Sequence, residues 1–239
     1  TDPYFGRLLK NTFMISGLTI LFGFPAPIIL ALMINEVKNS AFKRTVQTIT
    51  YMPYFISMVV LCGLLKTFCM QDGLFAQIAV LFGGKAQNYL ANPSYFRTIY
   101  VLSDIWSGIG WNSIIYLAAL SSIDQEQYEA ARVDGANRFK QMIHITLPGL
   151  VPTIMVLFIL RMGNILNVGY EKILLLYNSA TYSTADVIST YTYRLSFGGS
   201  GNPMYSKSTA IGLFNTIINV FFLMLTNMIS KKATDAGLF

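Results

Sequence analysis

Five long apolar runs, separated by polar segments, set the pattern of this chain. They cover residues 12–34, 45–65, 99–123, 145–168 and 208–230, and few charges interrupt them. A helix needs about 20 apolar residues to cross roughly 30 Å of hydrocarbon, so each run is long enough to span a membrane. Asp104 lies near the start of the third run and Arg161 lies inside the fourth. Pro25 and Pro27 should kink the first span, which membrane helices tolerate. The pattern predicts an all-α, polytopic transmembrane helical bundle with five spans.

The composition agrees with a membrane protein. The chain is 54% hydrophobic and 12% charged, and its mean hydropathy is +0.51. Soluble domains carry about 25% charged residues, so this chain has too few charges to cover a water-exposed surface. The net charge is +6, but the Lys and Arg residues are scattered rather than gathered in a patch. Basic loops at an anionic membrane are therefore expected, and a nucleic-acid partner is not.

The sequence offers no combination of residues for catalysis or metal binding. Cys62 and Cys69 lie seven residues apart in one apolar run, which on a helix is about two turns or some 10 Å, too far for a disulfide. The lone His144 cannot form a metal cluster. No phosphate-binding loop is present, because Gly84-Lys85 lacks the upstream Gly and the following Ser or Thr. We expect no catalytic residue, no metal and no cofactor, and hence a protein that is not an enzyme.

A polar, helix-forming segment at 124–147 separates the third and fourth runs. It reads YEAARVDGANRFKQMIHITLP from Tyr128 to Pro148. Gly135 should end a first short helix in the left-handed conformation, which costs glycine nothing. A second short helix should then run from about Ala136, and Pro148 should start the next span. An amphipathic helix that merely rests among lipid headgroups is the alternative interpretation.

The spacing inside this segment is specific. Glu129-Ala130-Ala131 is followed by three residues, then Gly135, then nine residues, then Ile145-x-Leu147-Pro148. This arrangement resembles the EAA loop of ABC importer permeases. The resemblance implies that the loop docks into a cytoplasmic ATPase and transmits the closure of that ATPase to the membrane domain. The residues that it assigns to this coupling are Glu129, Ala130, Ala131, Asp134, Gly135, Ala136, Leu147 and Pro148.

Three further segments resemble one branch of these permeases. They read ALMINEVKNSAFKRTVQTITYMPYFIS, SDIWSGIGWNSIIYLAALSSID and VGYEKILLLYNSATYSTADVISTYTYR. They are similar to the MalF-like permeases for oligosaccharides, close to the importers of complex polysaccharides and uronate oligosaccharides. The similarity covers essentially the whole chain, which implies one permease domain over residues 1–239 with the core of MetI-like type I importers. Family members carry an additional upstream span, so the resemblance predicts an N-terminally truncated chain.

The resemblance also implies partners and a location. A second permease, typically a different chain, would complete the pathway. A cytoplasmic ABC ATPase dimer would bind below it, and an extracytoplasmic solute-binding lipoprotein would deliver an oligosaccharide. The chain would lie in the bacterial cell (inner) membrane as a multi-pass protein. The loop at 36–44, the segment 124–147 and Lys231-Lys232 would then face the cytoplasm, as the modest excess of Lys and Arg there favours.

Polar and aromatic residues inside the third and fourth runs are candidates for the sugar pathway. An Arg or Asp at the centre of a bilayer costs about 2.5–3.5 kcal/mol on insertion scales, so such residues tend to face a cavity or a partner. The candidates are Asp104, Trp106, Trp111, Asn112, Arg161, Asn164 and Asn167. Alternative interpretations are that the two Trp residues belong to an interfacial belt and that Asp104 lies near a membrane end.

Two other functions stay open from the sequence. The EAA loop also occurs in ABC importer permeases for amino acids, peptides or ions, so the solute could be of another class. A proton-coupled secondary carrier would need acidic residues inside the membrane, and Asp104 meets that need poorly. The sequence also shows no internal repeat of the kind that secondary transporters carry.

Overall fold

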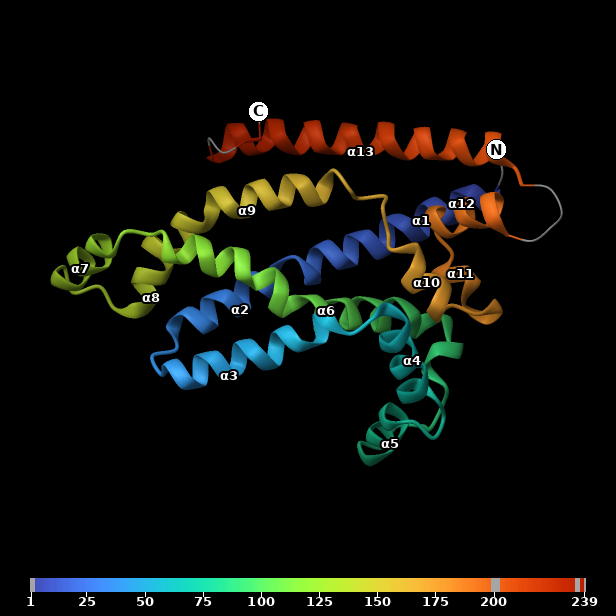
Figure 1. Ribbon diagram of the computed structural model, residues 1–239, viewed down its shortest axis with the longest axis horizontal. Helices are drawn as coiled ribbons and strands as arrows, with labels where there is room; N and C mark the ends of the chain where they lie inside the picture. Colours follow the sequence, from blue (N-terminus) through green and yellow to red (C-terminus); the bar gives the residue numbers. More distant parts are fainter. Residues whose placement is uncertain (1–2, 199–202, 235–236, 239) are drawn as a thin grey trace.

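The protein is a bundle of helices elongated along one axis. The computed structural model describes residues 3–198, 203–234 and 237–238, and every regular element in those residues is helical. Figure 1 shows α7 and α8 at one end of the bundle and α10, α11 and α12 at the other. The α-helices are α1 (Pro3–Leu18), α2 (Pro25–Glu36), α3 (Ser40–Tyr51), α4 (Met58–Cys69), α5 (Leu74–Leu81), α6 (Pro93–Ser121), α7 (Gln125–Val133), α8 (Arg138–Gln141), α9 (Leu147–Met162), α10 (Tyr170–Leu176), α11 (Tyr182–Ala185), α12 (Ile188–Phe197) and α13 (Tyr205–Thr234). Short 3-10 or π segments are η1 (Thr19–Gly23), η2 (Met52–Phe55), η3 (Tyr89–Ala91), η4 (Met142–Thr146) and η5 (Ser179–Thr181).

Helix α6 lies at the centre of the bundle. Asn92 caps it by accepting a hydrogen bond from the Ser94 N–H, and Pro93 occupies the first position, where a missing N–H costs little. Its first half contributes Phe96 to a core shared with α1, α4 and the segment 168–187. Its second half contributes Tyr116 to a separate core with α2 and α9. One long helix therefore connects the two ends of the molecule.

The packing of α3 against α6 depends on one glycine. A Cβ at Gly110 would lie 2.1 Å from the Thr50 carbonyl oxygen, a distance that no side chain can accept. Membrane helices associate through such close approaches, because lipid tails are as apolar as Leu and supply no hydrophobic driving force between helices. Gly110 thus sets the distance between these two helices.

Four helices in the described residues are long and apolar enough to cross a membrane. They are Tyr4–Glu36, Met58–Leu81, Arg138–Met162 and Tyr205–Lys232, the second of which comprises α4, a turn at residues 70–73 and α5. The predicted first, fourth and fifth spans coincide with three of them, although the fourth helix ends at Met162 rather than at 168. The predicted third span lies in α6. This helix has 29 residues, which is long enough, but its Ser, Gly, Trp and Tyr residues make it less apolar than the four helices above. The number of spans therefore stays a prediction.

The predicted span at 45–65 is not one helix. Helix α3 ends at Tyr51, a 3-10 turn follows, and Ile56 and Ser57 are extended before α4 begins. Pro53 causes the first change, because it has no N–H to donate to the preceding turn. Ser57 causes the second, because its side chain accepts the Val60 N–H and caps a new helix. Figure 1 shows α3 running alongside α6 and α4 turning away.

Two π-helical turns precede prolines. Segment η1 precedes Pro25, and segment η4 ends just before Pro148. A proline ring clashes with the carbonyl of the residue four positions earlier, and a wider turn relieves that clash. The second loop helix therefore begins at Arg138, capped by Asn137, and continues into α9. Pro148 lies in the first turn of α9, close to where it was expected, and the π turn joins that helix to α8 without a break.

A buried carboxylate joins the start of α1 to α12. Asp186 is fully buried, and both of its oxygens accept hydrogen bonds from the Arg194 guanidinium, at 2.8 and 2.6 Å. Thr190 donates to it at 2.7 Å, and the Tyr4 hydroxyl also donates to it. Burial by itself would raise the pKa of Asp186, but hydrogen bonds from the guanidinium, Tyr4 and Thr190 outweigh it and lower that pKa. This cluster holds the outer end of the bundle together.

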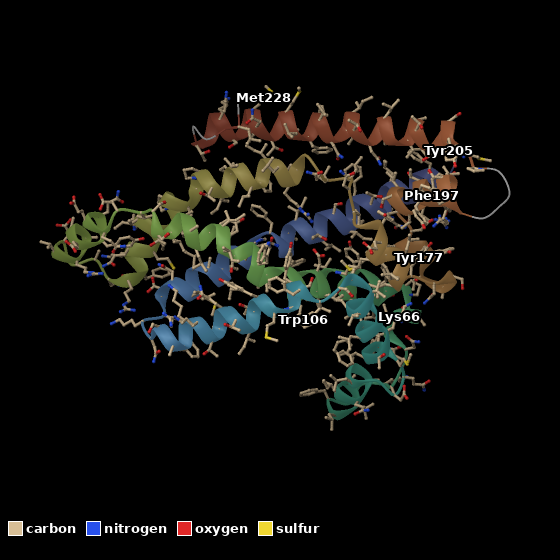
Figure 2. All side chains as sticks on the ribbon, viewed as in Figure 1. Lys66, Trp106, Tyr177, Phe197, Tyr205 and Met228 are labelled. Carbon is tan, nitrogen blue, oxygen red and sulfur yellow. The ribbon has the colours of Figure 1, made fainter. Side chains whose placement is uncertain are left out.

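The outward faces of the long helices are apolar. Leu213, Ile217 and Met228 on α13 are between 62% and 69% exposed, and Leu21 and Met33 are both 64% exposed. Figure 2 shows Met228 near the end of α13, away from the other helices. Apolar surfaces this extensive are typical of contact with lipid or with another membrane subunit.

Replacement of Asp186 should destabilise the outer end. The variant Asp186→Asn keeps the shape but leaves the Arg194 charge without its partner, which costs about 3–5 kcal/mol for a buried pair. The contribution is present at neutral pH and is lost only as the pH falls through the lowered Asp186 pKa. Unfolding of the purified protein in detergent, followed by thermal or denaturant titration, measures the loss.

The exposed pair between Glu36 and Arg138 is the matched control. Its atoms are 3.7 Å apart, and the two side chains are 44% and 60% exposed. Glu36→Gln should therefore change the unfolding free energy by less than about 1 kcal/mol. An equal effect of the two substitutions would show that burial of the Asp186 cluster does not contribute to stability.

Candidate functional site: an intramembrane cavity and a polar loop

Two adjoining cavities open between η1, α6 and the end of α9. The inner cavity has a volume of about 500 Å³ and the outer cavity about 370 Å³. The outer cavity extends toward α10, and the inner one toward the middle of α6. Their shared lining residues are Thr19, Asp104, Arg161, Asn164 and Asn167. The cavities therefore meet along one polar wall.

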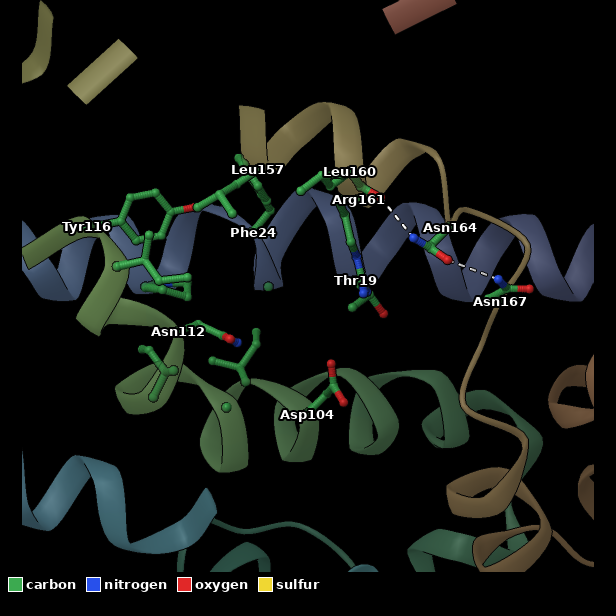
Figure 3. Close-up of a pocket in the computed structure, with 16 residues that line it drawn as sticks. Thr19, Phe24, Asp104, Asn112, Tyr116, Leu157, Leu160, Arg161, Asn164 and Asn167 are labelled. Atoms are coloured by element: carbon green, nitrogen blue, oxygen red, sulfur yellow. Dashed lines mark hydrogen bonds between the residues drawn. The ribbon is translucent and has the colours of Figure 1, made fainter. Parts of the chain in front are cut away.

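Five of the seven predicted pathway residues line the inner cavity. Asp104, Gly108 and Asn112 lie four residues apart on α6 and so occupy one face of that helix. Figure 3 shows Asp104 pointing from α6 toward the Arg161 side chain, which extends from α9 on the opposite side. The predicted residues that line this cavity are Asp104, Asn112, Arg161, Asn164 and Asn167.

Arg161 is an exposed charge in this cavity. Within the described residues its guanidinium forms no hydrogen bond and no ion pair. The polar residues beside it form hydrogen bonds that do not involve Arg161. The Asn164 amide donates to the Leu160 carbonyl at 3.1 Å, and the Asn167 amide donates to the Asn164 side chain at 3.0 Å. An unpaired Arg in a membrane span is costly unless water or a polar ligand reaches it. The cavity must therefore be wet or hold a polar ligand.

The charge of Asp104 has a partner that the sequence did not indicate. The Lys172 ammonium lies 3.4 Å from the Asp104 carboxylate and donates to the Tyr100 carbonyl at 3.1 Å. It also lies 4.5 Å from the centre of the Tyr100 ring, close enough for a cation–π contact. Lys172 is only 2% exposed. Nothing in the sequence spacing connects residues 104 and 172, so this pair could only be found in the fold.

The wall between the two cavities is not helical. After α9 ends, residues 163–169 form turns and irregular backbone. Three side chains from other helices form hydrogen bonds with the backbone of this segment. Ser16 donates to the Ile165 carbonyl, Asn219 accepts the Leu166 N–H at 3.1 Å, and Ser189 donates to the Val168 carbonyl at 2.9 Å. Irregular backbone at membrane depth is tolerated only where it is buried in protein or lines a cavity. The polar residues Ser16, Ser189 and Asn219 are therefore part of this site, although sequence reasoning missed them.

The structure does not bring the two Trp residues to the polar cavity. Trp106 lines a separate apolar groove of about 590 Å³ between α4, α5 and α6. Trp111 stacks on Tyr54, with ring centres 4.6 Å apart and planes 6° apart. Both are partly exposed, at 49% and 40%. Helical spacing puts Trp106 on the side of α6 opposite Asp104, whereas Trp111 lies seven residues from Asp104, near the same face, and is kept from the cavity by its stacking on Tyr54.

The segment 124–147 projects from the other end of the bundle. Asp124 caps α7 by accepting the Glu126 N–H. Gly135 has a φ of 76°, which confirms the left-handed conformation expected there. The Ala136 N–H reaches the Ala131 carbonyl at 2.8 Å and the Gly135 N–H reaches the Arg132 carbonyl at 3.0 Å, the two hydrogen bonds of a Schellman motif. Gly135 therefore sets the angle between α7 and the next helix.

The predicted coupling residues occupy an exposed knob. Glu129, Ala130 and Asp134 are exposed, and Ala131 and Ala136 are half-buried. The Tyr128 hydroxyl is 3.0 Å from the Thr146 hydroxyl, so α7 is tied to the start of the next membrane helix. A shallow hollow of about 310 Å³ lies beside the knob. Leu147 and Pro148 lie at the first turn of α9, where the loop joins the bundle.

Most of the chain matches a single protein family. Residues 23–235 match the family model described as binding-protein-dependent transport system inner membrane component. The match covers most of the chain, which therefore belongs to this family. The predicted helical fold, the membrane location and the resemblance to ABC importer permeases are confirmed by this match and by the relatives below.

Named relatives match over the full length of the chain. Protein LplB of Bacillus subtilis (strain 168) is 43% identical over 239 residues, which are 100% of this chain and 74% of that protein. The polygalacturonan/rhamnogalacturonan transport system permease protein YteP of the same organism is 41% identical over 240 residues, again 74% of its length. The crystal structure of a bacterial alginate ABC transporter with its alginate pentasaccharide-bound periplasmic protein contains a chain that is 46% identical, with a TM-score of 0.94, over 100% of this chain and 82% of that one.

Proposed function

We propose that this chain is the permease subunit that forms half of the translocation pathway of an ATP-driven oligosaccharide importer. A second permease forms the other half, an ABC ATPase dimer binds on the cytoplasmic side, and an extracytoplasmic binding protein delivers the sugar. The observation that carries this proposal is the polar cavity around Arg161, Asn164 and Asn167, enclosed by membrane helices of a chain from this transport family. The names of YteP and the alginate transporter support an oligosaccharide as the solute.

The charges around the cavity favour an acidic oligosaccharide. Lys172 neutralises Asp104, so the inner cavity presents the unpaired cation of Arg161. Glu171 lines the outer cavity but not the inner one. A uronate carboxylate could accept two parallel hydrogen bonds from the guanidinium, which is the geometry that Arg prefers. Asn112, Asn164 and Asn167 add amide groups that can bind sugar hydroxyls.

The loop at 124–147 supports coupling to an ATPase. Its small residues, Ala130 and Ala131, let another surface approach α7 closely, and its exposed Glu129 and Asp134 lie at the same end. One continuous helix then runs from Arg138 to Met162 and carries Arg161 in its last turn, at the cavity wall. In this proposal, a displacement of the knob reaches the cavity through that helix.

The other candidate functions have less support. An importer for an amino acid, a peptide or an ion would use the same loop, but YteP and the alginate transporter chain, at 41% and 46% identity, belong to systems named for polysaccharides. A proton-coupled carrier would need an unpaired acid deep in the membrane cavity, and Asp104, the acid that lines the inner cavity, is paired with Lys172. We therefore keep the oligosaccharide importer as the proposal.

The orientation of the chain can be tested by cysteine labelling. Lys38→Cys and Val133→Cys should react with a membrane-impermeant maleimide only when the cytoplasmic face is accessible, because both exposed positions lie at the coupling end. Lys85→Cys should react from outside intact cells. Reaction of Lys38→Cys or Val133→Cys from outside would refute the orientation.

The labelling has a low background and suitable sites. Cys62 and Cys69 are free but buried, at 1% and 0% exposure, so the native thiols should stay unreactive. Asn39 and Asn137 are exposed as well, but their side chains cap α3 and α8 and should be kept. The unmodified chain, labelled under the same conditions, is the control.

Arg161 should distinguish acidic from neutral sugars. Arg161→Ala should lower transport of a uronate oligosaccharide at least about tenfold, since a hydrogen bond to a charged group contributes roughly 1.5–3 kcal/mol. Transport of a neutral oligosaccharide of equal length should change much less, and Arg161→Lys should retain part of the activity. Transport by the complex reconstituted in liposomes measures this, with assembly and basal ATPase as controls. Equal losses for both sugars would show that Arg161 does not read charge.

Gly135 should be required for coupling. A Cβ there meets no atom within 4 Å, so Gly135→Val acts only through the backbone, where positive φ costs a non-glycine residue roughly 1–2 kcal/mol. The angle between α7 and the next helix should change. Sugar-stimulated ATP hydrolysis and transport should then both fall, while membrane insertion stays normal. Gly135→Asn is the matched control, because Asn tolerates the left-handed region. Stimulated ATPase at the unmodified level in Gly135→Val would show that the loop angle does not matter.

A further inference from the structure

A row of exposed aromatic rings continues from the outer cavity. Tyr170 lines that cavity and lies 5.5 Å from the Tyr193 ring, with the planes 25° apart. Tyr193 lies 5.5 Å from the Phe197 ring in turn. The three side chains are 47%, 40% and 74% exposed. We name Tyr170, Tyr193 and Phe197 the aromatic row.

The direction of the row follows from α12. Ser189, Tyr193 and Phe197 are four residues apart, so they share one face of that helix. Ser189 donates to the Val168 carbonyl, and Val168 is part of the outer cavity wall. This face therefore begins at the cavity wall and continues for two turns, roughly 12 Å, toward Phe197. Figure 2 places Phe197 at the same end of the molecule as Tyr205, away from the coupling loop.

The chemistry of the row suits a sugar chain. The C–H groups on one face of a sugar ring are apolar and can pack on an aromatic ring, while its hydroxyls stay in water. Consecutive rings at similar spacing can hold consecutive sugars without reading a particular hydroxyl pattern. Two Tyr hydroxyls at the cavity side add polar contacts. Rings this exposed would otherwise stay in contact with water, which is unfavourable for their apolar faces.

We propose that the aromatic row is a sugar-binding subsite at the extracytoplasmic mouth, which holds the part of an oligosaccharide that has not yet entered the cavities. It rests on the proposed function, since it needs an oligosaccharide in the pathway. The row is continuous with the cavity wall through Tyr170, and this continuity favours the sugar over a protein as the occupant. A short sugar fits within the cavities and does not reach the row, whereas a longer one does.

The test compares sugars of two lengths. The complex, with its partner permease, ATPase and binding protein, is reconstituted in liposomes and supplied with uronic-acid oligosaccharides: the shortest that is transported, and one longer by two residues. The readout is the ratio of the two initial transport rates at saturating loaded binding protein, longer over shorter. Tyr193→Ala or Phe197→Ala should lower this ratio by several-fold to roughly tenfold, as expected for loss of a stacked ring.

Conservative and distant variants complete the test. Tyr193→Phe and Phe197→Tyr should retain the ratio, because stacking needs the ring and not the hydroxyl. Tyr205→Ala removes an aromatic ring that is 61% exposed at the same end but outside the row, and it should leave the ratio unchanged. An unchanged ratio in Tyr193→Ala and Phe197→Ala would overturn the proposal.

Three other outcomes also decide the matter. If the Ala variants lose assembly, or lose ATPase stimulation by sugar-free binding protein, the row contacts a protein and the proposal is wrong. If the unmodified complex transports neither uronic-acid nor neutral oligosaccharides, the proposed function fails, and that failure is separate from any defect of the row. Equal loss for both lengths, with assembly intact, also overturns the subsite.

Discussion

The structure depends on one constraint: a polar group that lies in hydrocarbon must find a polar partner. Helices satisfy the backbone within each span, so the constraint is felt where helices break. The break at residues 163–169 shows the solution, since Ser16, Asn219 and Ser189 come from three different helices to bind its backbone. The same constraint ties Asp186 to Arg194 and Asp104 to Lys172. Asp104 and Lys172 are distant in the sequence, and Asp186 also binds Tyr4 of α1. These polar contacts therefore also fix how the helices are arranged.

Arg161 is the cavity residue that this constraint leaves without a partner among the described residues. Its position explains why, because α9 ends one residue later and the irregular segment opens the wall of both cavities. A charge that is not neutralised by the protein can be neutralised by a ligand, and that ligand must bring its own polar groups. In the proposed importer, such an exchange has a direction: the solute enters from the side of α10 and α12 and meets Arg161 at the junction of the two cavities.

The coupling loop and the cavity are connected by a single element. The helix from Arg138 to Met162 has 25 residues, a length of roughly 37 Å, and it carries the loop at one end and Arg161 at the other. The π turn at Met142–Thr146 lies where the loop joins this helix, and Thr146 contacts Tyr128 of α7. Because this helix is continuous, a small displacement of the knob can move the cavity wall at the other end of the helix. The Gly135 turn sets the direction in which the knob points.

Local pattern was enough to predict much of this protein. The apolar runs indicate membrane helices, because hydrocarbon selects for length and composition alone, and the spacing from Glu129 to Pro148 indicates the family, because the loop is continuous in the chain. The left-handed Gly135 and the shared face of Asp104 and Asn112 on α6 also follow from spacing along the chain, whereas the approach of Arg161 to that face needed the fold. Only the tertiary structure decided that Trp106 and Trp111 lie away from the cavity, that Pro53 and Ser57 divide the predicted span at 45–65, and that Lys172 neutralises Asp104. These features depend on which faces of different helices meet, and periodicity within one helix carries no information about its neighbour.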